Sequence, residues 1–214
     1  MAVGLSGGKD SLALLYVLKL FQKHAPFPFE LKAVHVDLGW ADDQIMPLNR
    51  LAELLAIPLH IEKTAIARVV FERRREKNPC ALCANLRRGA LHQAALQAGA
   101  RKVALGHHLD DAIQTYLLNL IYTGQMSTFK PVTLLDRTGL TQIRPLIQIP
   151  EQIITNLARR EGWPVVVNPC PASGKTKRRE MANLVEELVD RYPDLRDKWR
   201  AALMNSLFRE PGPE

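Results

Sequence analysis

The chain has 214 residues, a formal net charge of +7 and a sequence pI near 9.5, which is compatible with a polyanionic partner such as nucleic acid and equally with a merely basic surface. Its apolar fraction of 47% and charged fraction of 24% are ordinary for a globular protein with one α/β domain and a modest appendage. The sequence contains neither an apolar run that could span a bilayer nor a signal peptide, so we expect a cytoplasmic protein with no membrane partner.

Short apolar segments alternate with helix-forming segments along most of the chain. We predict strands at Met1–Leu5, Leu31–Asp37, Leu59–Glu62 and Lys102–Gly106, and an edge strand at Gln142–Leu146, where Pro145 cannot donate to a ladder. We predict helices at Asp10–Lys23, Asp43–Leu55, Leu86–Ala98, Asp110–Tyr122 and Pro150–Arg160. This alternation is typical of βαβ units, so the predicted fold is α/β: a mostly parallel sheet with helices on both faces.

The character of the sequence changes after Cys170. A basic segment at Ser173–Arg179 is followed by two amphipathic patterns, which predict helices at Met181–Tyr192 and Leu195–Leu207. We therefore predict a nucleotide-binding domain over residues 1–172, and a basic segment with a C-terminal helical appendage over residues 173–214.

A glycine-rich loop directly follows the first predicted strand. It reads Ser6-Gly7-Gly8-Lys9-Asp10-Ser11. Glycines between a strand and a helix let the backbone approach an anion, which the helix N-terminus also favours. The loop is not a Walker A motif, because Asp10 stands where that motif has Ser or Thr. Asp10 would repel phosphate unless Mg²⁺ lay between them, so Mg²⁺ is implied; the alternative is an ordinary glycine turn with a capping side chain.

The same loop resembles the PP-loop of the N-type ATP pyrophosphatases. The resemblance implies a Rossmann-like PP-loop fold in residues 1–172 and cleavage of ATP between its α- and β-phosphates, through an adenylated intermediate. It assigns all six residues of the loop to ATP binding and gives Lys9 and Asp10 catalytic roles.

The sequence contains three cysteines, which is too few for a four-ligand structural zinc site unless a histidine completes it. Cys80 and Cys83 have chelating spacing, and Cys170 lies between two prolines. A redox Cys-x-x-Cys pair would need no third cysteine. Three thiolates can instead hold a cubane iron–sulfur cluster and leave one iron open. The residues alone leave these alternatives standing.

Four motifs in this order resemble the tRNA 2-thiocytidine synthetase group and the related 2-thiouridine enzymes. They are Cys80-Ala-Leu-Cys83-Ala-Asn-Leu-Arg87-Arg88-Gly89, Gly106-His107-His108-Leu109-Asp110-Asp111, Arg144-Pro145-Leu146 and Asn168-Pro169-Cys170-Pro171. The resemblance spans Gly4 to about Pro171. It implies a 4Fe-4S cluster on Cys80, Cys83 and Cys170, with sulfur from sulfide or a cysteine desulfurase system held at the free iron. A homodimer is implied by the resemblance only.

The resemblance also assigns further site residues. Asp111 is expected to bind Mg²⁺ or assist at the activated base, although Asp110 and Asp111 could instead cap a helix. Arg87 is expected to supply a catalytic cation. His35, Val36 and Gly106 are expected at the nucleotide, and His107 or His108 at the substrate. From their charge alone, the basic runs are candidates for contacts with tRNA phosphates or for a solvated face: Arg73–Arg75, Lys77 and Lys175–Arg179.

The predicted function is therefore an ATP-dependent tRNA sulfurtransferase that adenylates C2 of a pyrimidine, with cytidine favoured, and replaces the oxygen with sulfur. Three other functions stay open: a lysidine synthetase-like ligase, a small-molecule sulfur-transfer enzyme and a non-catalytic nucleotide-binding module. Two features depart from the family. The chain begins almost on its first strand, so we expect an element upstream of that strand to be absent, and the zinc ribbons of the 2-thiouridine enzymes are missing.

Overall fold

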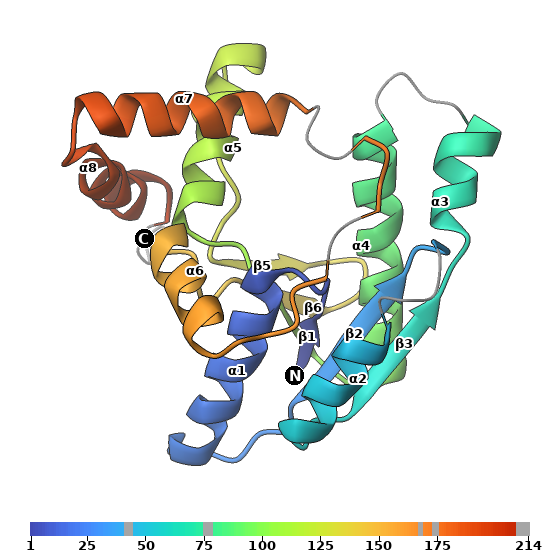
Figure 1. Cartoon of the computed structure of the whole chain (residues 1–214). Helices are drawn as coiled ribbons and strands as arrows, with labels where there is room; N and C mark the ends of the chain where they lie inside the picture. The colour runs from blue at the N-terminus through green and yellow to red at the C-terminus, as the bar shows by residue number, and fades with distance from the viewer. Residues whose placement is uncertain (41–44, 75–78, 167–168, 173–175, 209–214) are drawn as a thin grey trace.

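The computed structural model describes residues 1–40, 45–74, 79–166, 169–172 and 176–208. A six-stranded sheet with the order β3-β2-β1-β4-β6-β5 lies at its centre (Figure 1). The strands are β1 (Ala2–Gly4), β2 (Lys32–Asp37), β3 (Leu59–Lys63), β4 (Lys102–Ala104), β5 (Val132–Leu135) and β6 (Leu140–Ile143). All neighbouring strands pair in parallel except β5 and β6, which confirms the predicted α/β fold with a mostly parallel sheet.

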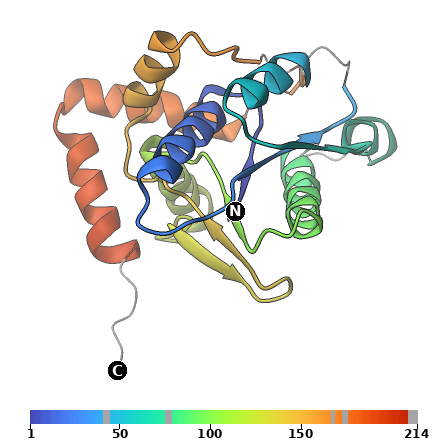
Figure 2. The ribbon, with the colours of Figure 1, turned by 90° about the horizontal axis from the view of Figure 1, so that it is seen from below.

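Helices cover both faces of this sheet (Figures 1 and 2). They are α1 (Lys9–His24), α2 (Ile45–Leu54), α3 (Ile66–Arg68), α4 (Pro79–Gln97), α5 (Leu109–Thr123), α6 (Glu151–Arg160), α7 (Lys177–Arg191) and α8 (Leu195–Ala202), with π-helical turns η2 (Val69–Arg74) and η3 (Leu203–Leu207). The predicted start of the second helix at Asp43 lies outside the described residues. None of the described helices is long and apolar enough to cross a membrane.

Two hydrophobic clusters hold the helices to the sheet, because successive strand residues point to opposite faces. Val3 of β1 packs with α1, α2 and α6, whereas its neighbour Ala2 packs with α4, α3 and η2 on the other face. Val34 and Val36 of β2 share the face of Ala2. The sheet is thus sandwiched between α1, α2 and α6 on one side and α4 with α3 on the other.

A third cluster joins α5 to the C-terminal helices. Leu109 and Ile113 of α5 pack with Val185 of α7 and Leu203 of η3, all nearly inaccessible to solvent. The C-terminal helices therefore have a shared core with α5, and α7 crosses α5 in Figure 1. The boundary that we place between residues 172 and 173 stays a prediction.

The prediction of an edge strand at Gln142–Leu146 is wrong. β6 ends at Ile143 and lies between β4 and β5, so the true edge strand is β5, which the sequence analysis missed. Pro145 does not interrupt a ladder, because it comes after the strand has ended. α4 begins at Pro79 and not at the predicted Leu86, so Cys80 and Cys83 lie within its first turns.

Candidate active site

The loop Ser6–Ser11 is organised by its own hydrogen bonds at the carboxyl end of β1. The Ser11 hydroxyl donates to the carbonyl of Gly8 at 2.9 Å and accepts from the backbone N–H of Ser6 at 3.1 Å. The Ser6 hydroxyl lies 3.1 Å from that of Ser11 and accepts from the N–H of Gly8 at 3.3 Å. The two serines therefore shape the loop, and α1 begins within it, at Lys9.

Two glycines allow close packing around this loop. Gly7 has φ of +85°, which favours glycine, and its carbonyl accepts from the N–H of Val166 at 3.0 Å. A Cβ on Gly106, after β4, would lie 2.8 Å from the carbonyl oxygen of Asp10. The structure thus brings Gly106 against the start of α1, as expected if both segments bind one nucleotide.

The ammonium group of Lys9 makes two ion pairs beside the Ser6–Ser11 loop. It lies 2.8 Å from Asp10 and 2.6 Å from Glu151, the first residue of α6. Burial lowers the pKa of Lys9, but hydrogen bonds to the two carboxylates outweigh it and the pKa is raised. Burial likewise raises the pKa of Glu151, but Lys9 lowers it to below its usual range. The sequence analysis missed Glu151, which is 142 residues away from Lys9 in the chain.

Asp110 and Asp111 have different surroundings. Asp110 is 3% exposed; it accepts from the N–H of Glu151 at 2.7 Å and from the guanidinium of Arg196 at 2.8 Å. Asp111 closes a capping box with His108: its carboxylate accepts from the His108 N–H at 3.2 Å, and its own N–H donates to His108 Nδ1 at 3.3 Å. Asp111 also lies 3.7 Å from Arg178 of α7. Asp111 is therefore the more open of the two carboxylates.

His107 lies among arginines from several elements. Its ring packs on Phe129 with centroids 4.8 Å apart, and the guanidinium of Arg144 lies 4.8 Å from the same phenyl ring. Burial, then the charges of Arg144 and Arg178, lowers the pKa of His107 to about 3, so the ring is neutral at physiological pH. Among the described residues, its buried Nδ1 has no hydrogen-bond partner. The neutral imidazole of His107 is therefore surrounded by positively charged arginine side chains.

One side of α4 connects the sheet to the cysteines. Leu91 packs so closely over Gly4 that a Cβ there would lie 2.9 Å from Leu91 Cδ2. Arg87 and Cys83 follow at helical spacing on the same side, about 6 and 12 Å further along the axis at 1.5 Å per residue. Arg87 is close enough for its charge to act on both Cys83 and His107. Arg87 and Cys83 therefore project beyond the end of β1, towards the level of the loop.

Cys170 comes to the beginning of α4 from a distant part of the chain. The described residues around it, 169–172, lie beside the first turns of α4 (Figure 1). Burial raises the pKa of the Cys83 thiol, and the charges of Cys170 and Cys80 raise it further while Arg87 opposes them. No disulfide joins the three cysteines, of which Cys80 is exposed.

The three thiols fit a group bound by three thiolates, since they converge without a disulfide. Within the described ranges, no three His, Cys, Asp or Glu side chains already stand in the arrangement of a metal site.

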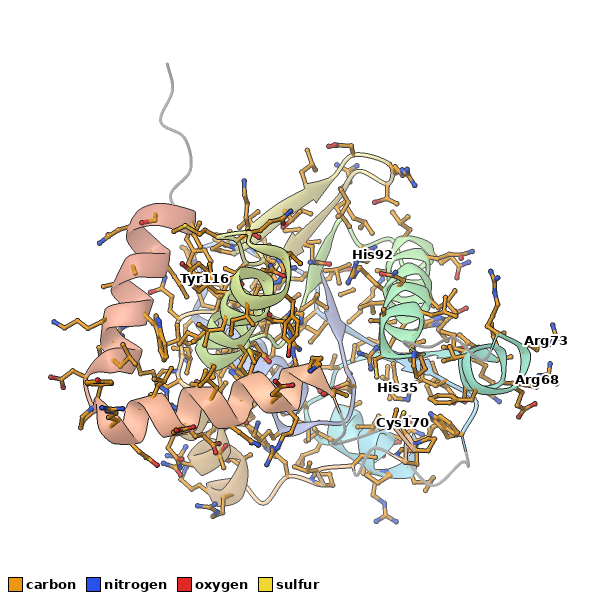
Figure 3. The ribbon with its side chains drawn as sticks, turned by 90° about the horizontal axis from the view of Figure 1, so that it is seen from above. His35, Arg68, Arg73, His92, Tyr116 and Cys170 are labelled. Carbon is orange, nitrogen blue, oxygen red and sulfur yellow. The ribbon has the colours of Figure 1, made fainter. Side chains whose placement is uncertain are left out.

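The remaining predicted residues flank this centre. His35 is buried, and its Nδ1 lies 2.8 Å from the carbonyl of Leu5, while Val36 is buried in β2 against the α4 face. The exposed basic residues of η2 and α7 lie on opposite sides of the strand ends; Figure 3 labels Arg68 and Arg73 on the η2 side. Of the predicted tRNA contacts, Arg75, Lys77 and Lys175 lie outside the described residues.

Comparison with protein families and curated proteins identifies related chains. The PP-loop domain family matches residues 1–187. A tRNA-cytidine(32) 2-sulfurtransferase from Pelobacter propionicus is 39% identical over 208 residues, which are 96% of this chain and 77% of the relative. The enzyme of the same name from Citrifermentans bemidjiense is 36% identical over 96% of this chain and 82% of its own length.

Solved structures are also similar. The U34-tRNA thiolase NcsA from Methanococcus maripaludis, solved with its [4Fe-4S] cluster, superposes with a TM-score of 0.77 and 26% identity, covering 99% of this chain and 73% of the thiolase. An NH3-dependent NAD synthetase from Campylobacter jejuni has a TM-score of 0.52 at 16% identity, over 100% of this chain and 87% of the synthetase, which shows a shared fold alone.

Proposed function

Because the chain belongs to the PP-loop domain family and, within it, to the group of the tRNA-cytidine(32) 2-sulfurtransferases, we propose that it is an ATP-dependent tRNA 2-thiolation enzyme. Its substrates are ATP and tRNA, and its cofactors are Mg²⁺ and a 4Fe-4S cluster. We extend to this chain the base and position in the names of its relatives, cytidine 32 of tRNA.

One observation carries this proposal: the phosphate loop and the first turns of α4, which contain Cys80 and Cys83, both lie at the carboxyl ends of the strands. The loop follows β1, and Leu91 packs over the last residue of that strand. Arg87 and Cys83 extend from Leu91 past the strand end, and Cys170 joins them from the segment after α6. A substrate base held there would face a group that activates oxygen and a group that supplies sulfur.

The residues of the loop account for the activation step. The N–H groups at the start of α1 would bind the phosphates of ATP, and the hydroxyls of Ser6 and Ser11 would join them by turning their donors from the loop to the phosphate oxygens. Mg²⁺, carried by those phosphates, would be held by Asp10 or Asp111 and would neutralise their charge. The C2 carbonyl oxygen of the pyrimidine attacks the α-phosphorus, the bond to the bridging oxygen breaks, and pyrophosphate leaves. Lys9 stabilises the negative charge that develops on the leaving group.

The three cysteines account for the delivery of sulfur. When bound by Cys80, Cys83 and Cys170, a 4Fe-4S cluster supplies an iron without a protein ligand, at which a sulfur atom can be carried. Sulfide then adds to C2, the bond from C2 to the activated oxygen breaks, AMP leaves and a proton is lost, so no oxidant or reductant is needed. Arg87 lies near Cys83 and His107, where it can balance the charge of the departing AMP.

The charged surface agrees with a tRNA substrate. Exposed arginines of η2 and α7 lie on either side of the strand ends, where they can contact phosphates on both sides of an unpaired base. We further propose that sulfide or a cysteine desulfurase system provides the sulfur, that the enzyme acts in the cytoplasm and that it forms a homodimer.

The other functions have less support. A lysidine synthetase-like ligase or a non-catalytic module gives no role to three converging thiols. A small-molecule sulfur-transfer enzyme gives no role to the exposed arginines of η2 and α7.

The proposal is tested by mass spectrometry of tRNA nucleosides from a strain that lacks the gene. We expect 2-thiocytidine to disappear and to return when the gene is restored. Anaerobically purified protein should be brown, with about four iron and about four sulfide per chain. Unchanged thionucleosides, or a colourless protein with one zinc, would overturn the proposal.

A further inference from the structure

The ammonium group of Lys9 is held by two carboxylates. Asp10 Oδ1 lies at 2.8 Å and Glu151 Oε1 at 2.6 Å, and the Lys9 side chain is 25% exposed. An ammonium group has three N–H donors, so these contacts leave one donor for a phosphate oxygen. Lysine has a flexible stem of four carbons, and two fixed acceptors restrict where its charge can lie. The pair with Glu151 therefore orients Lys9 as well as balancing its charge.

The position of Glu151 is fixed by contacts between the start of α6 and its neighbouring helices. As the first residue of α6, Glu151 donates its backbone N–H to Asp110 Oδ2 at 2.7 Å. Asp110 is 3% exposed, and its other oxygen accepts from Arg196 of α8 at 2.8 Å. The N–H of Leu109 also donates to the carbonyl of Ile149 at 3.0 Å, which ties α5 to the segment before α6. The start of α6 is thus fixed to α5 and α8, and Glu151 extends from this support to Lys9.

We propose that Glu151 is a positioning residue for Lys9: it holds the ammonium group at the mouth of the loop so that its remaining donor meets the departing pyrophosphate. The inference rests on the proposed function, since it names a residue that serves the adenylation step. Glu151 acts through Lys9 and does not itself touch the phosphates. We expect Glu151 to assist the step in which negative charge develops on the leaving pyrophosphate. It should therefore alter kcat more than the affinity for ATP.

Two other roles for Glu151 make different predictions. An acidic residue in the first turn of α6 could merely stabilise the helix, in which case any carboxylate there would suffice. Glu151 could also compete with ATP for Lys9, in which case its removal would lower the KM for ATP. The variants Glu151→Gln and Glu151→Asp separate these roles, because Asp keeps the charge at the start of α6 but is shorter by one methylene group.

The experiment measures tRNA-dependent pyrophosphate release by the cluster-loaded enzyme over a range of ATP concentrations. We expect Glu151→Gln to lower kcat roughly 10- to 100-fold, with the KM for ATP within about threefold of wild type. Glu151→Asp should keep the wild-type melting temperature and still lower kcat at least about fivefold. The matched control is Glu161→Gln at the other end of α6, where Glu161 pairs only with exposed Arg160 among the described residues. It should behave like wild type.

Several outcomes would overturn the role of Glu151. They are an unchanged kcat in Glu151→Gln, a lower KM for ATP with kcat retained, or full recovery of kcat in Glu151→Asp. Each would have to occur in a preparation whose wild-type enzyme releases pyrophosphate with tRNA. A wild-type enzyme that releases none would overturn the proposed function, and the role of Glu151 with it.

Discussion

The phosphate loop and the cysteine site both lie at the carboxyl ends of the strands, but they are built differently. The loop is complete within a few residues: Ser6, Gly8 and Ser11 bond to one another, and α1 begins within the loop at Lys9. The cysteine site draws its groups from two distant parts of the chain, the start of α4 and the residues around Cys170 after α6.

The difference reflects what each ligand needs. A phosphate is bound by backbone N–H groups and a helix end, which the chain can shape through its own hydrogen bonds. A cluster is bound by thiolates that repel one another until a metal group neutralises them, so part of the ordering free energy comes with the cofactor. We therefore expect the ATP site to persist without the cluster, and the four predictions below test this separation.

The largest effect is expected for Cys170→Ser, which removes one thiolate from the cysteine site. Thiolation should fall below detection in nucleoside mass spectrometry, because two thiolates from one turn of α4 cannot retain the cluster. ATP affinity, measured by calorimetry, should stay within about twofold of wild type, since phosphate is held by the loop itself. Surviving thiolation would show that the third ligand is misassigned, and lost ATP binding would show that the two sites are not separable.

The second prediction concerns the negative charge of Asp111. Asp111→Asn can still accept from the His108 N–H but loses the carboxylate charge, so pyrophosphate release should fall about 100-fold. Its stability should change by less than about 1 kcal/mol. The matched variant Asp110→Asn leaves Arg196 facing a neutral partner, so it should lose about 1–3 kcal/mol of stability. Full turnover in Asp111→Asn would remove Asp111 from the catalytic residues.

The third prediction concerns a substitution that disturbs the packing of Gly106 against the start of α1. In Gly106→Ala the new Cβ would lie 2.8 Å from the Asp10 carbonyl, so the start of α1 must shift. We expect a loss of about 1–3 kcal/mol in denaturant unfolding and about tenfold weaker ATP binding, with iron content unchanged. Gly89→Ala is the control, because nothing lies within 4 Å of its Cβ in α4 and it should stabilise by up to about 1 kcal/mol. Equal behaviour of the two variants would contradict the prediction.

The smallest effect is expected at His107, whose ring packs on Phe129. Its pKa is lowered from 6.5 to about 3 in the folded chain, so acid protonates the unfolded state first. Stability attributable to this group is therefore present above pH 6.5 and is lost as the pH falls towards 3, by at most about 2 kcal/mol between pH 6.5 and 5. His107→Gln should lose this part of the pH dependence in thermal unfolding. An unchanged slope would mean that His107 is accessible to protons in the folded protein.

Local patterns predicted more of this molecule than long-range ones. The alternation of strands and helices predicts the α/β fold, and the loop after β1 is found where the glycine pair lies. β5 has only the four residues Val132–Leu135 between Pro131 and a turn near Asp136 and Gly139, which is too short a pattern to predict a strand, so the sequence predicts β6 as the edge.

The candidate site shows the same limit. The resemblance to a family selects Asp111 for the site, but only packing gives the physical difference between the buried Asp110 and the more open Asp111. No pattern in the sequence connects Glu151 to Lys9, because a contact across 142 residues depends on how α6 docks against α1. The convergence of Cys170 on α4 was available only through the resemblance to a family, since spacing alone left zinc and redox chemistry open.

The close contact of Leu91 with Gly4 has a consequence for how the sequence can change. Leu91 fixes α4 to the sheet, so the direction of Cys83 depends on how many residues separate the two. Inserting a single residue between them would rotate both cysteines by about 100° around the helix axis, away from Cys170. Apart from Arg87, positions between Cys83 and Leu91 should therefore tolerate substitutions better than insertions or deletions, because only a change of length redirects the cysteines.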